Sequence, residues 1–262
     1  MRFFLLSLAG WVALLSPAGA GWQSEVEALR PGTFPPPPDL TVRYVFGWSG
    51  LVAARAEIKL QAGPRGVWSG RVRAGTEGWV RALWKLDATY NTSVATEDWQ
   101  SLDFTLIESY RRYEVEEKVV FRSGGGRSWR ESKSKGAKPP KWKNFYVAGL
   151  RDMAGAILLA RSQLLQDGDR IKLAVFPGDG MYLVEVRVEG REKLRWGGGD
   201  HPVIRLSLHI DQIKKDYSLS PHTKFRHGTV WVSDDELRLP LRLEVGVFVG
   251  YVFAEMEAVE TR

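Results

Sequence analysis

The stretch that decides the fold is Val52-Ala53-Ala54-Arg55-Ala56-Glu57-Ile58-Lys59-Leu60. Every even-numbered position in it is apolar, whereas Arg55, Glu57 and Lys59 occupy odd-numbered positions. Because successive side chains of a strand point to opposite faces of a sheet, this alternation predicts a β-strand with one buried face and one solvated face. Residues 47–50, which precede it, contain two glycines and predict a turn.

Similar alternation recurs along the chain at short spacing. The segments are residues 67–74, 89–96, 104–115, 118–122, 170–176, 182–188, 203–210, 228–232, 239–247 and 251–259. Glycine-rich stretches at residues 124–126, 178–180 and 197–200 supply the positive φ angles that hairpin turns use. Many short strands joined by such turns predict antiparallel pairing rather than parallel strands with crossover helices.

Two segments depart from this pattern, residues 76–86 and residues 150–165, where apolar side chains recur at helical spacing. A curved sheet with one apolar face needs a cover, and these helices would supply it. The predicted fold class is therefore mainly β: a strongly curved antiparallel sheet or half-open β-barrel with two short covering helices. The barrel would be closed or half-closed, and a two-sheet sandwich is the second alternative.

The first twenty residues differ from the rest of the chain. A short positive start at Met1-Arg2, an apolar stretch over residues 3–15 and the small residues Ala18-Gly19-Ala20 predict a signal peptide cleaved after Ala20. The apolar stretch is shorter than the roughly twenty residues that span a bilayer. Residues 21–39 would form a proline-rich extended leader, and residues 40–262 a single β-rich domain. We expect the protein to be periplasmic.

The composition excludes several chemistries. The chain has no cysteine, which rules out disulfides, thiolate nucleophiles and Cys-ligated zinc or iron–sulfur sites. A histidine metal site would require His222 and His227 to converge with Asp211 or Asp216, and we expect surface histidines instead. The sequence predicts no metal and no cofactor.

Enzymatic signals are weak. Residues 47–51 contain a serine between glycines but lack the final glycine of the Gly-x-Ser-x-Gly motif. Asp234, Asp235 and Glu236 lie near Trp231 and would suit a carbohydrate-active protein, yet adjacent acids are also typical of a solvated turn. No catalytic residue is predicted, and a non-enzymatic function is favoured.

Positive charge is concentrated in a basic loop at residues 122–143. Eight cations and one anion, Glu131, give this segment +7, against +6 for the whole chain. The predicted anion-binding residues are Arg127, Arg130, Lys133, Lys135, Lys138 and Lys141. In an exported protein the expected partner is a lipid or anionic glycolipid, with peripheral membrane contact and no nucleic acid. A solvated loop without a partner is the alternative.

The two predicted helices suggest a second binding region. Trp79 and Trp84 on the first, with Ile157 and Leu158 on the second, would line an apolar cavity beneath the curved sheet. Packing into a solid core is the alternative, because aromatic side chains commonly fill protein interiors.

Four stretches carry a family resemblance: residues 44–50, the turn Phe176-Pro177-Gly178-Asp179-Gly180, residues 182–192 that follow it, and residues 229–242 with Trp231, Asp234 and Pro240 as a motif. They resemble the exported bacterial proteins grouped as domain-of-unknown-function family 3108. This resemblance implies a mostly antiparallel β protein of the Gram-negative periplasm or outer membrane, without catalytic residues to carry over. It also suggests a shape similar to the half-open barrels of periplasmic lipoprotein carriers, by analogy of fold.

Together these features predict a non-enzymatic periplasmic binding or carrier module for an amphiphile or anionic envelope component. Two alternatives remain: a carbohydrate-active or polysaccharide-processing protein, and a structural partner in envelope assembly. The sequence leaves the ligand and the oligomeric state open.

Overall fold

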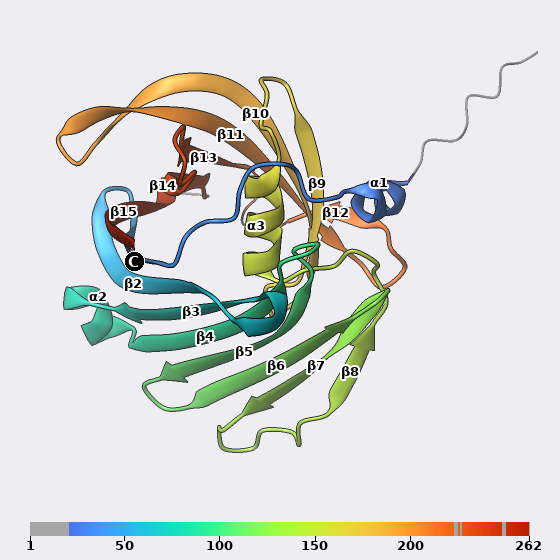
Figure 1. Cartoon of the computed structure of the whole chain (residues 1–262). Helices are drawn as coiled ribbons and strands as arrows, with labels where there is room; N and C mark the ends of the chain where they lie inside the picture. The colour runs from blue at the N-terminus through green and yellow to red at the C-terminus, as the bar shows by residue number, and fades with distance from the viewer. Residues whose placement is uncertain (1–20, 223–224, 226, 248–249, 262) are drawn as a thin grey trace, which may run out of the picture.

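The computed structural model of the protein describes residues 21–222, 225, 227–247 and 250–261 (Figure 1). The predicted signal peptide and its cleavage after Ala20 lie outside these residues. No helix within the described ranges is long and apolar enough to cross a membrane.

The fold is one curved antiparallel sheet of fifteen strands, as counted over the described residues. The strands are β1 (Leu40–Trp48), β2 (Leu51–Ala62), β3 (Val67–Thr76), β4 (Leu86–Ala95), β5 (Ser101–Tyr110), β6 (Glu114–Arg122), β7 (Gly125–Ser132), β8 (Trp142–Phe145), β9 (Arg170–Val175), β10 (Met181–Trp196), β11 (Gly199–Ile213), β12 (Leu219–Pro221), β13 (His227–Ser233), β14 (Pro240–Gly246) and β15 (Tyr251–Thr261).

The order of the strands explains the shape. A meander from β1 to β8 forms one half, the strands from β9 to β15 form the other, and β1 joins them by pairing with β15. The edge strands are β8 and β9, so the sheet is open. The prediction of a strongly curved antiparallel sheet is confirmed, and the closed-barrel alternative is wrong. The stretch that predicted the fold forms most of β2, where it pairs with β1 on one side and β3 on the other.

In the described part of the chain, three short α-helices accompany the sheet: α1 (Trp22–Ala28), α2 (Gly78–Leu83) and α3 (Met153–Ser162). The two predicted helices are present as α2 and α3, each shorter than expected. Helix α1 lies in the leader, where the prolines predicted only extended chain; the prolines begin at Pro31, beyond the end of this helix. Figure 1 shows α3 inside the curve of the sheet and α2 at its outer margin.

Helix α3 is the main filling of the concave side. Its Leu158 and Leu159 are buried in a cluster with Trp68, Ile171 and Ile204 from three different strands. Burying such side chains supplies most of the favourable free energy of a domain without disulfides, at about 25 cal/mol per Å² of apolar surface. The helix therefore holds the two halves of the sheet around one core.

A buried carboxylate fixes where α3 begins. Asp152 is fully buried and caps the helix by accepting a hydrogen bond from the Gly155 amide at 2.7 Å. Its oxygens also accept hydrogen bonds from the hydroxyls of Tyr90, Thr92 and Ser101, which lie on β4 and β5. The start of α3 is thereby tied to the inner face of the first meander.

The carboxyl end of α3 is held by the leader and by the turn between β13 and β14. Arg161 donates to the carbonyls of Glu236 and Leu237 at 3.1 and 2.9 Å. The ring of Phe34 lies 4.9 Å from the Arg161 guanidinium and 3.6 Å from that of Arg238. The leader thus crosses the domain and packs against the helix it passes.

Candidate functional site

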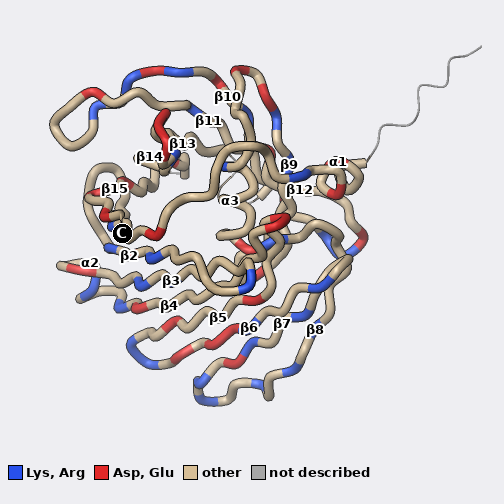
Figure 2. The backbone as a smooth tube through the Cα atoms, in the orientation of Figure 1, with Lys and Arg blue, Asp and Glu red and all other residues tan. Residues whose placement is uncertain are grey.

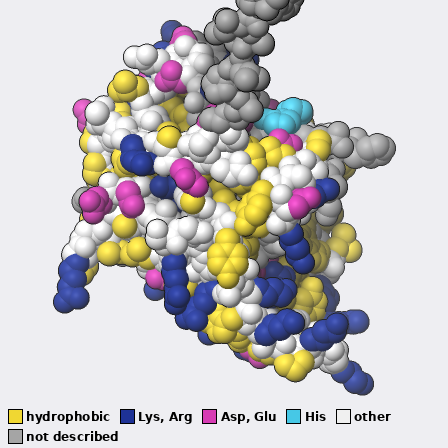
Figure 3. Space-filling model, turned by 90° about the vertical axis from the view of Figure 1, so that its right-hand side faces the viewer, with side chains coloured by type: hydrophobic (Ala, Val, Ile, Leu, Met, Phe, Trp, Pro, Cys, Tyr) yellow, Lys and Arg dark blue, Asp and Glu magenta, His cyan; other side chains and the backbone are white. Residues whose placement is uncertain are grey.

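A groove of about 1000 Å³ lies at the open side of the sheet. One wall comes from β7, β8 and the intervening residues 133–141; the other comes from residues 176–181 and the end of β11. We call it the seam groove, because it lies where the two edges of the sheet approach without pairing. Figure 3 shows the face of the molecule that carries this side, with Lys and Arg side chains gathered over its lower part.

The floor of the seam groove is apolar. Phe145 at the end of β8 stacks on Phe176, directly after β9, with ring centroids 4.9 Å apart and planes inclined by 18°. Both rings are buried, and Met181 and Ile213 line the groove beside them. The stacked pair joins the two halves of the sheet through side chains, at the place where their backbones do not pair.

The rim of the seam groove is cationic. Its lining contains six cations, Arg130, Lys138, Lys141, Lys143, Lys214 and Lys215, and two acids, Glu117 and Asp179. No ion pair involves any of the five lysines among the residues described. In Figure 2 the Lys and Arg positions of β7 and β8 follow the lower margin of the sheet. Uncompensated ammonium groups around an apolar floor favour a ligand with an anionic part and an apolar part.

Glu117 is the one buried acid in this lining. It lies on β6 in the same phase as Val115, Val119 and Phe121, all of which point to the core. Its carboxylate accepts a hydrogen bond from Arg130 at 2.9 Å. Burial raises the pKa of Glu117 to about 7, against the opposing effect of the Arg130 charge.

The turn between β9 and β10 packs against this carboxylate. Gly178 has a φ of +132°, and a Cβ atom at this position would lie 3.2 Å from a carboxylate oxygen of Glu117. Glycine meets both demands, because it adopts positive φ freely and has no side chain. Residues 176–180, singled out by sequence, thus form part of the groove wall.

The predicted anion-binding residues divide between the groove and its surroundings. Arg130, Lys138 and Lys141 line the groove. Arg127 lies outside it, with its guanidinium 4.4 Å from the ring centroid of Trp142. Lys133 forms an ion pair with Glu114 at 2.8 Å, and Lys135 is exposed and does not contribute to the lining.

Five charged lining residues were not among the predicted site residues: Glu117, Lys143, Asp179, Lys214 and Lys215. The sequence could have identified Glu117, because it is a charged residue at a position where the alternation of the strand predicts a buried apolar side chain. The pair Lys214-Lys215 carries no such signal, since a turn with two lysines is ordinary and only the curvature of the sheet brings it to residues 138–143.

The four predicted cavity residues are not brought together. Trp79 lies within α2 and Trp84 directly after it, with 59% and 53% of their surface exposed. Leu158 is buried in the core beneath α3, while Ile157 lies on the exposed side of that helix. The separation arises because α2 connects β3 to β4 at the margin of the sheet and has no buried residue, whereas α3 lies inside the curve (Figure 1).

The family motif occupies the β13–β14 hairpin. Trp231 donates from its indole nitrogen to Glu192 at 2.6 Å, Asp234 accepts from Arg191 at 3.2 Å, and the Pro240 carbonyl accepts from the Tyr44 hydroxyl at 2.8 Å. Within the turn, Asp235 accepts from the amides of Leu237 and Arg238. Two of the acids considered for sugar chemistry, Asp234 and Asp235, thus have partners that shape the hairpin. Arg238 in turn donates to carbonyls at the end of α3.

The histidines form one pair. The Nδ1 atoms of His209 and His227 lie 3.3 Å apart, and His209 Nε2 lies 3.3 Å from Asp211. His222 instead packs against Tyr182 and Phe225, so it does not converge with His227. Within the described part of the chain, no group of three side chains is arranged to hold a metal ion.

Comparison with known proteins gives a family and a fold. The family model described as "Protein of unknown function (DUF3108)" matches residues 41–257. No curated protein matches the chain in sequence.

Among solved structures, a β-barrel-like protein of domain of unknown function DUF1849 from Brucella abortus is similar to this chain. It has a TM-score of 0.56 and 11% identity, over 86% of this chain and 98% of its own. The hypothetical lipoprotein YmcC from Escherichia coli aligns with a TM-score of 0.29 and 7% identity, over 92% and 90% of the two chains. LprF from Mycobacterium bovis aligns with a TM-score of 0.28 and 11% identity, over 90% and 88%. At 11% identity the first likeness shows a similar fold and nothing about function. The TM-scores of the other two are too low to establish a shared fold.

Proposed function

Because the chain belongs to the DUF3108 family, whose function is unknown, we propose a function from the geometry of the seam groove. The protein is a non-enzymatic binding or carrier module of the cell envelope, and the groove holds one anionic amphiphile. The apolar part of this ligand lies on the floor formed by Phe145 and Phe176. Its anionic head meets the lysines of the rim. The pattern of residues 1–20 supports a periplasmic location.

One observation carries this proposal: lysines from two segments about seventy residues apart converge on a single groove with an apolar floor. Lys138 and Lys141 precede β8, whereas Lys214 and Lys215 follow β11. Like charges repel, so collecting lysines that form no ion pair among the described residues at one place costs free energy unless an anion occupies the site. A solvated loop at residues 133–141 without a partner would not require Lys214 and Lys215 on the opposite wall of the groove.

The dimensions agree with a small ligand rather than a protein partner. Ligand sites commonly enclose about 300 to 1,000 Å³ and combine apolar walls with a few polar groups. The seam groove, at about 1000 Å³, lies at the upper end of this range. It is open on one side, so a ligand enters without any strand having to separate from the sheet.

The direct test is binding of a monomeric anionic lipid, lysophosphatidylglycerol, below its micelle concentration, measured by calorimetry. We expect the combined substitutions Lys138→Gln, Lys141→Gln, Lys214→Gln and Lys215→Gln to weaken binding at least tenfold. The matched control removes the same number of positive charges outside the groove, with Lys59→Gln, Lys118→Gln, Lys172→Gln and Lys193→Gln. Equal losses in both variants would show a general charge effect and contradict a site in the groove.

A second measurement tests the apolar floor. Binding of free fatty acids should strengthen with chain length, because each fully buried methylene contributes about 0.8 kcal/mol. Glycerol phosphate, which carries the anionic group without a chain, should not bind detectably. If the affinity did not change with chain length, the groove would recognise the anion alone, and an amphiphile would be excluded as its ligand.

A further inference from the structure

Helix α2 and the neighbouring β1–β2 turn form a second surface, separate from the seam groove. We call it the aromatic rim and define it as Trp48, Leu51, Val52, Trp79, Leu83 and Trp84. All six side chains are exposed; Leu83 is the most exposed, at 78% of its surface. A helical turn with no buried residue has no packing reason to be apolar. Contiguous exposed apolar surface of this kind marks an interaction site.

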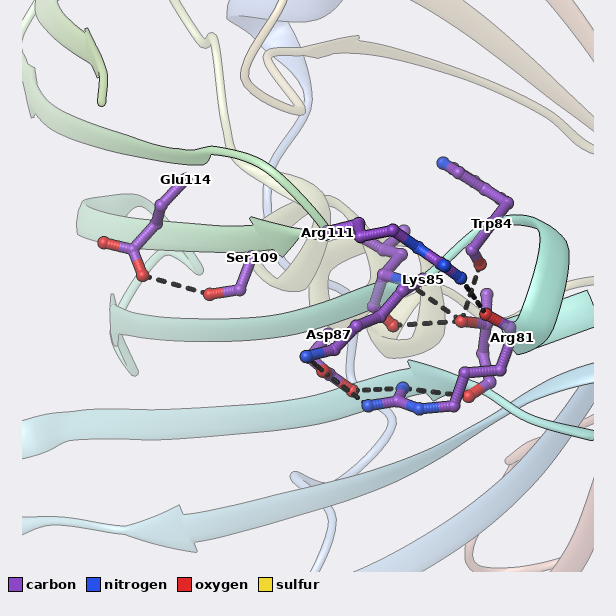
Figure 4. A network of polar contacts seen from close by, with 9 residues as sticks. Arg81, Trp84, Lys85, Asp87, Ser109, Arg111 and Glu114 are labelled. Carbon is purple, nitrogen blue, oxygen red and sulfur yellow. Dashed lines mark hydrogen bonds and ion pairs between the residues drawn. The ribbon is translucent and has the colours of Figure 1, made fainter. Parts of the chain in front are cut away.

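Polar contacts hold the aromatic rim in a defined shape (Figure 4). Arg111 donates to the carbonyls of Arg81 and Ala82, at 3.2 and 2.6 Å, in the last turn of α2. Arg81 forms a two-point ion pair with Asp87, with N–O distances of 2.7 and 2.9 Å. The Thr76 hydroxyl donates to the Trp84 carbonyl at 3.0 Å. The backbone of α2 is therefore fixed by polar groups while its apolar side chains face solvent.

The two parts of the rim are connected. The Glu77 amide donates to the Ala53 carbonyl at 2.9 Å, and Arg55 forms an ion pair with Glu77. The β1–β2 turn itself is tight, with positive φ angles at Ser49 and Gly50. The rim is thus one surface carried by two adjacent connections of the sheet.

The charges around the rim identify the partner. Arg81, Lys85 and Arg111 lie beside the apolar side chains, and Arg112 follows Arg111 in the turn between β5 and β6. Among the nearby acids, Glu77 pairs with Arg55, and Asp87 pairs with Arg81 and Lys85. Neither Arg111 nor Arg112 has an ion pair within the described chain. Tryptophan is enriched at membrane–water interfaces, and cations beside it add attraction to anionic lipids. We propose that the aromatic rim docks the protein on an anionic bilayer, with the indoles and Leu83 entering the headgroup region.

This docking surface is distinct from the ligand site. Helix α2 connects β3 to β4, and β4, β5, β6 and β7 separate it from the edge strand β8 in the order of the sheet (Figure 1). The proposal does not depend on the function proposed for the groove, and the two fail separately. Substituting the groove lysines should leave rim docking in place.

Co-sedimentation with vesicles of phosphatidylglycerol and phosphatidylethanolamine tests the proposal. We expect Trp79→Ser, Leu83→Ser and Trp84→Ser together to weaken binding at least tenfold, with an unchanged melting temperature because these side chains bury no core surface. The control is Leu102→Ser with Leu164→Ser, two exposed leucines outside the rim. Unchanged vesicle binding in the triple variant would overturn the proposal and leave a protein partner as the occupant of the rim.

A second readout reports insertion directly. Because the chain has no cysteine, Leu83→Cys can be labelled at one position with an environment-sensitive dye. We expect a blue shift and a severalfold rise in emission with anionic vesicles, weakened by salt because exposed charges are screened. The same dye at Leu102→Cys should not respond. Binding without any change at position 83 would also overturn the proposal.

Discussion

Among the residues that the structure describes, two carboxylates are buried, and their surroundings differ. Asp152, at the start of α3, accepts hydrogen bonds from three hydroxyls and one amide. Glu117, in the wall of the seam groove, has one hydrogen-bond partner in the described structure, Arg130. A buried acid with four donors is a structural anchor, because its charge is stabilised by fixed dipoles. A buried acid with one charged partner beside a groove is able to respond to protons and ligands.

The largest expected effect concerns the anchor. Asp152→Ala removes the cap of α3 and leaves the hydroxyls of Tyr90, Thr92 and Ser101 without their acceptor. We expect a loss of about 3 to 5 kcal/mol in the free energy of unfolding, since each buried unsatisfied group costs about 1 to 3 kcal/mol. Urea unfolding measures it. Asp152→Asn, which retains one acceptor oxygen, should lose less; equal losses would mean that the carboxylate charge itself is essential.

The next effect concerns Glu117 and pH. Burial raises its pKa to about 7 in the folded protein, above the value of about 4.5 in an unfolded chain. The folded state therefore binds more protons between these values, and stability falls as pH rises from 5 to 8. We expect a fall of about 2 to 3 kcal/mol, at about 1.4 kcal/mol per pKa unit.

Glu117→Gln should remove this slope and be more stable than the wild type at pH 8. Unfolding by urea at several pH values tests both statements. Glu116→Gln is the control, because Glu116 precedes Glu117 on the same strand and pairs with Lys118 at 2.9 Å. A slope that survives in Glu117→Gln would assign the pH dependence to another group.

A smaller effect on stability concerns Arg130, the one hydrogen-bond partner of Glu117 in the described structure. Arg130→Gln leaves the Glu117 carboxylate buried without its cation. The half-exposed arginine limits the loss, and we expect about 1 to 2 kcal/mol at pH 8. At pH 5, where Glu117 is protonated, the loss should be close to zero. A loss of equal size at both pH values would mean that Arg130 stabilises the protein through packing of its stem.

The smallest expected effect concerns the ligand. Above pH 7 the ionised Glu117 adds a negative charge to the groove wall, so binding of lysophosphatidylglycerol should weaken roughly threefold between pH 6 and pH 8, a change below about 1 kcal/mol. Glu117→Gln should bind equally at both values. Calorimetry measures this difference, and tighter binding at pH 8 in the wild type would contradict a head group near Glu117.

The alternation of residues 52–60 predicted the strand because period two is a local property of the backbone. The groove depends on the whole sheet. Phe145 stacks on Phe176, and Lys141 and Lys214 line one groove, only because the strands curve until the edges of the sheet approach. No local pattern encodes that curvature. The four predicted cavity residues lie apart for the same reason. Helical spacing identified α2 and α3 but not the place of each helix relative to the sheet.

An open sheet has two edges, and free edges tend to pair with other chains and aggregate. Here β8 is only four residues long and follows Pro139 and Pro140, which cannot donate backbone hydrogen bonds. The other edge, β9, is partly occupied by the chain itself, because the Arg151 amide donates to Ala174 and the Phe176 amide donates to Arg151. The protein therefore keeps an accessible groove between its edges while leaving few backbone groups for a second molecule to extend the sheet.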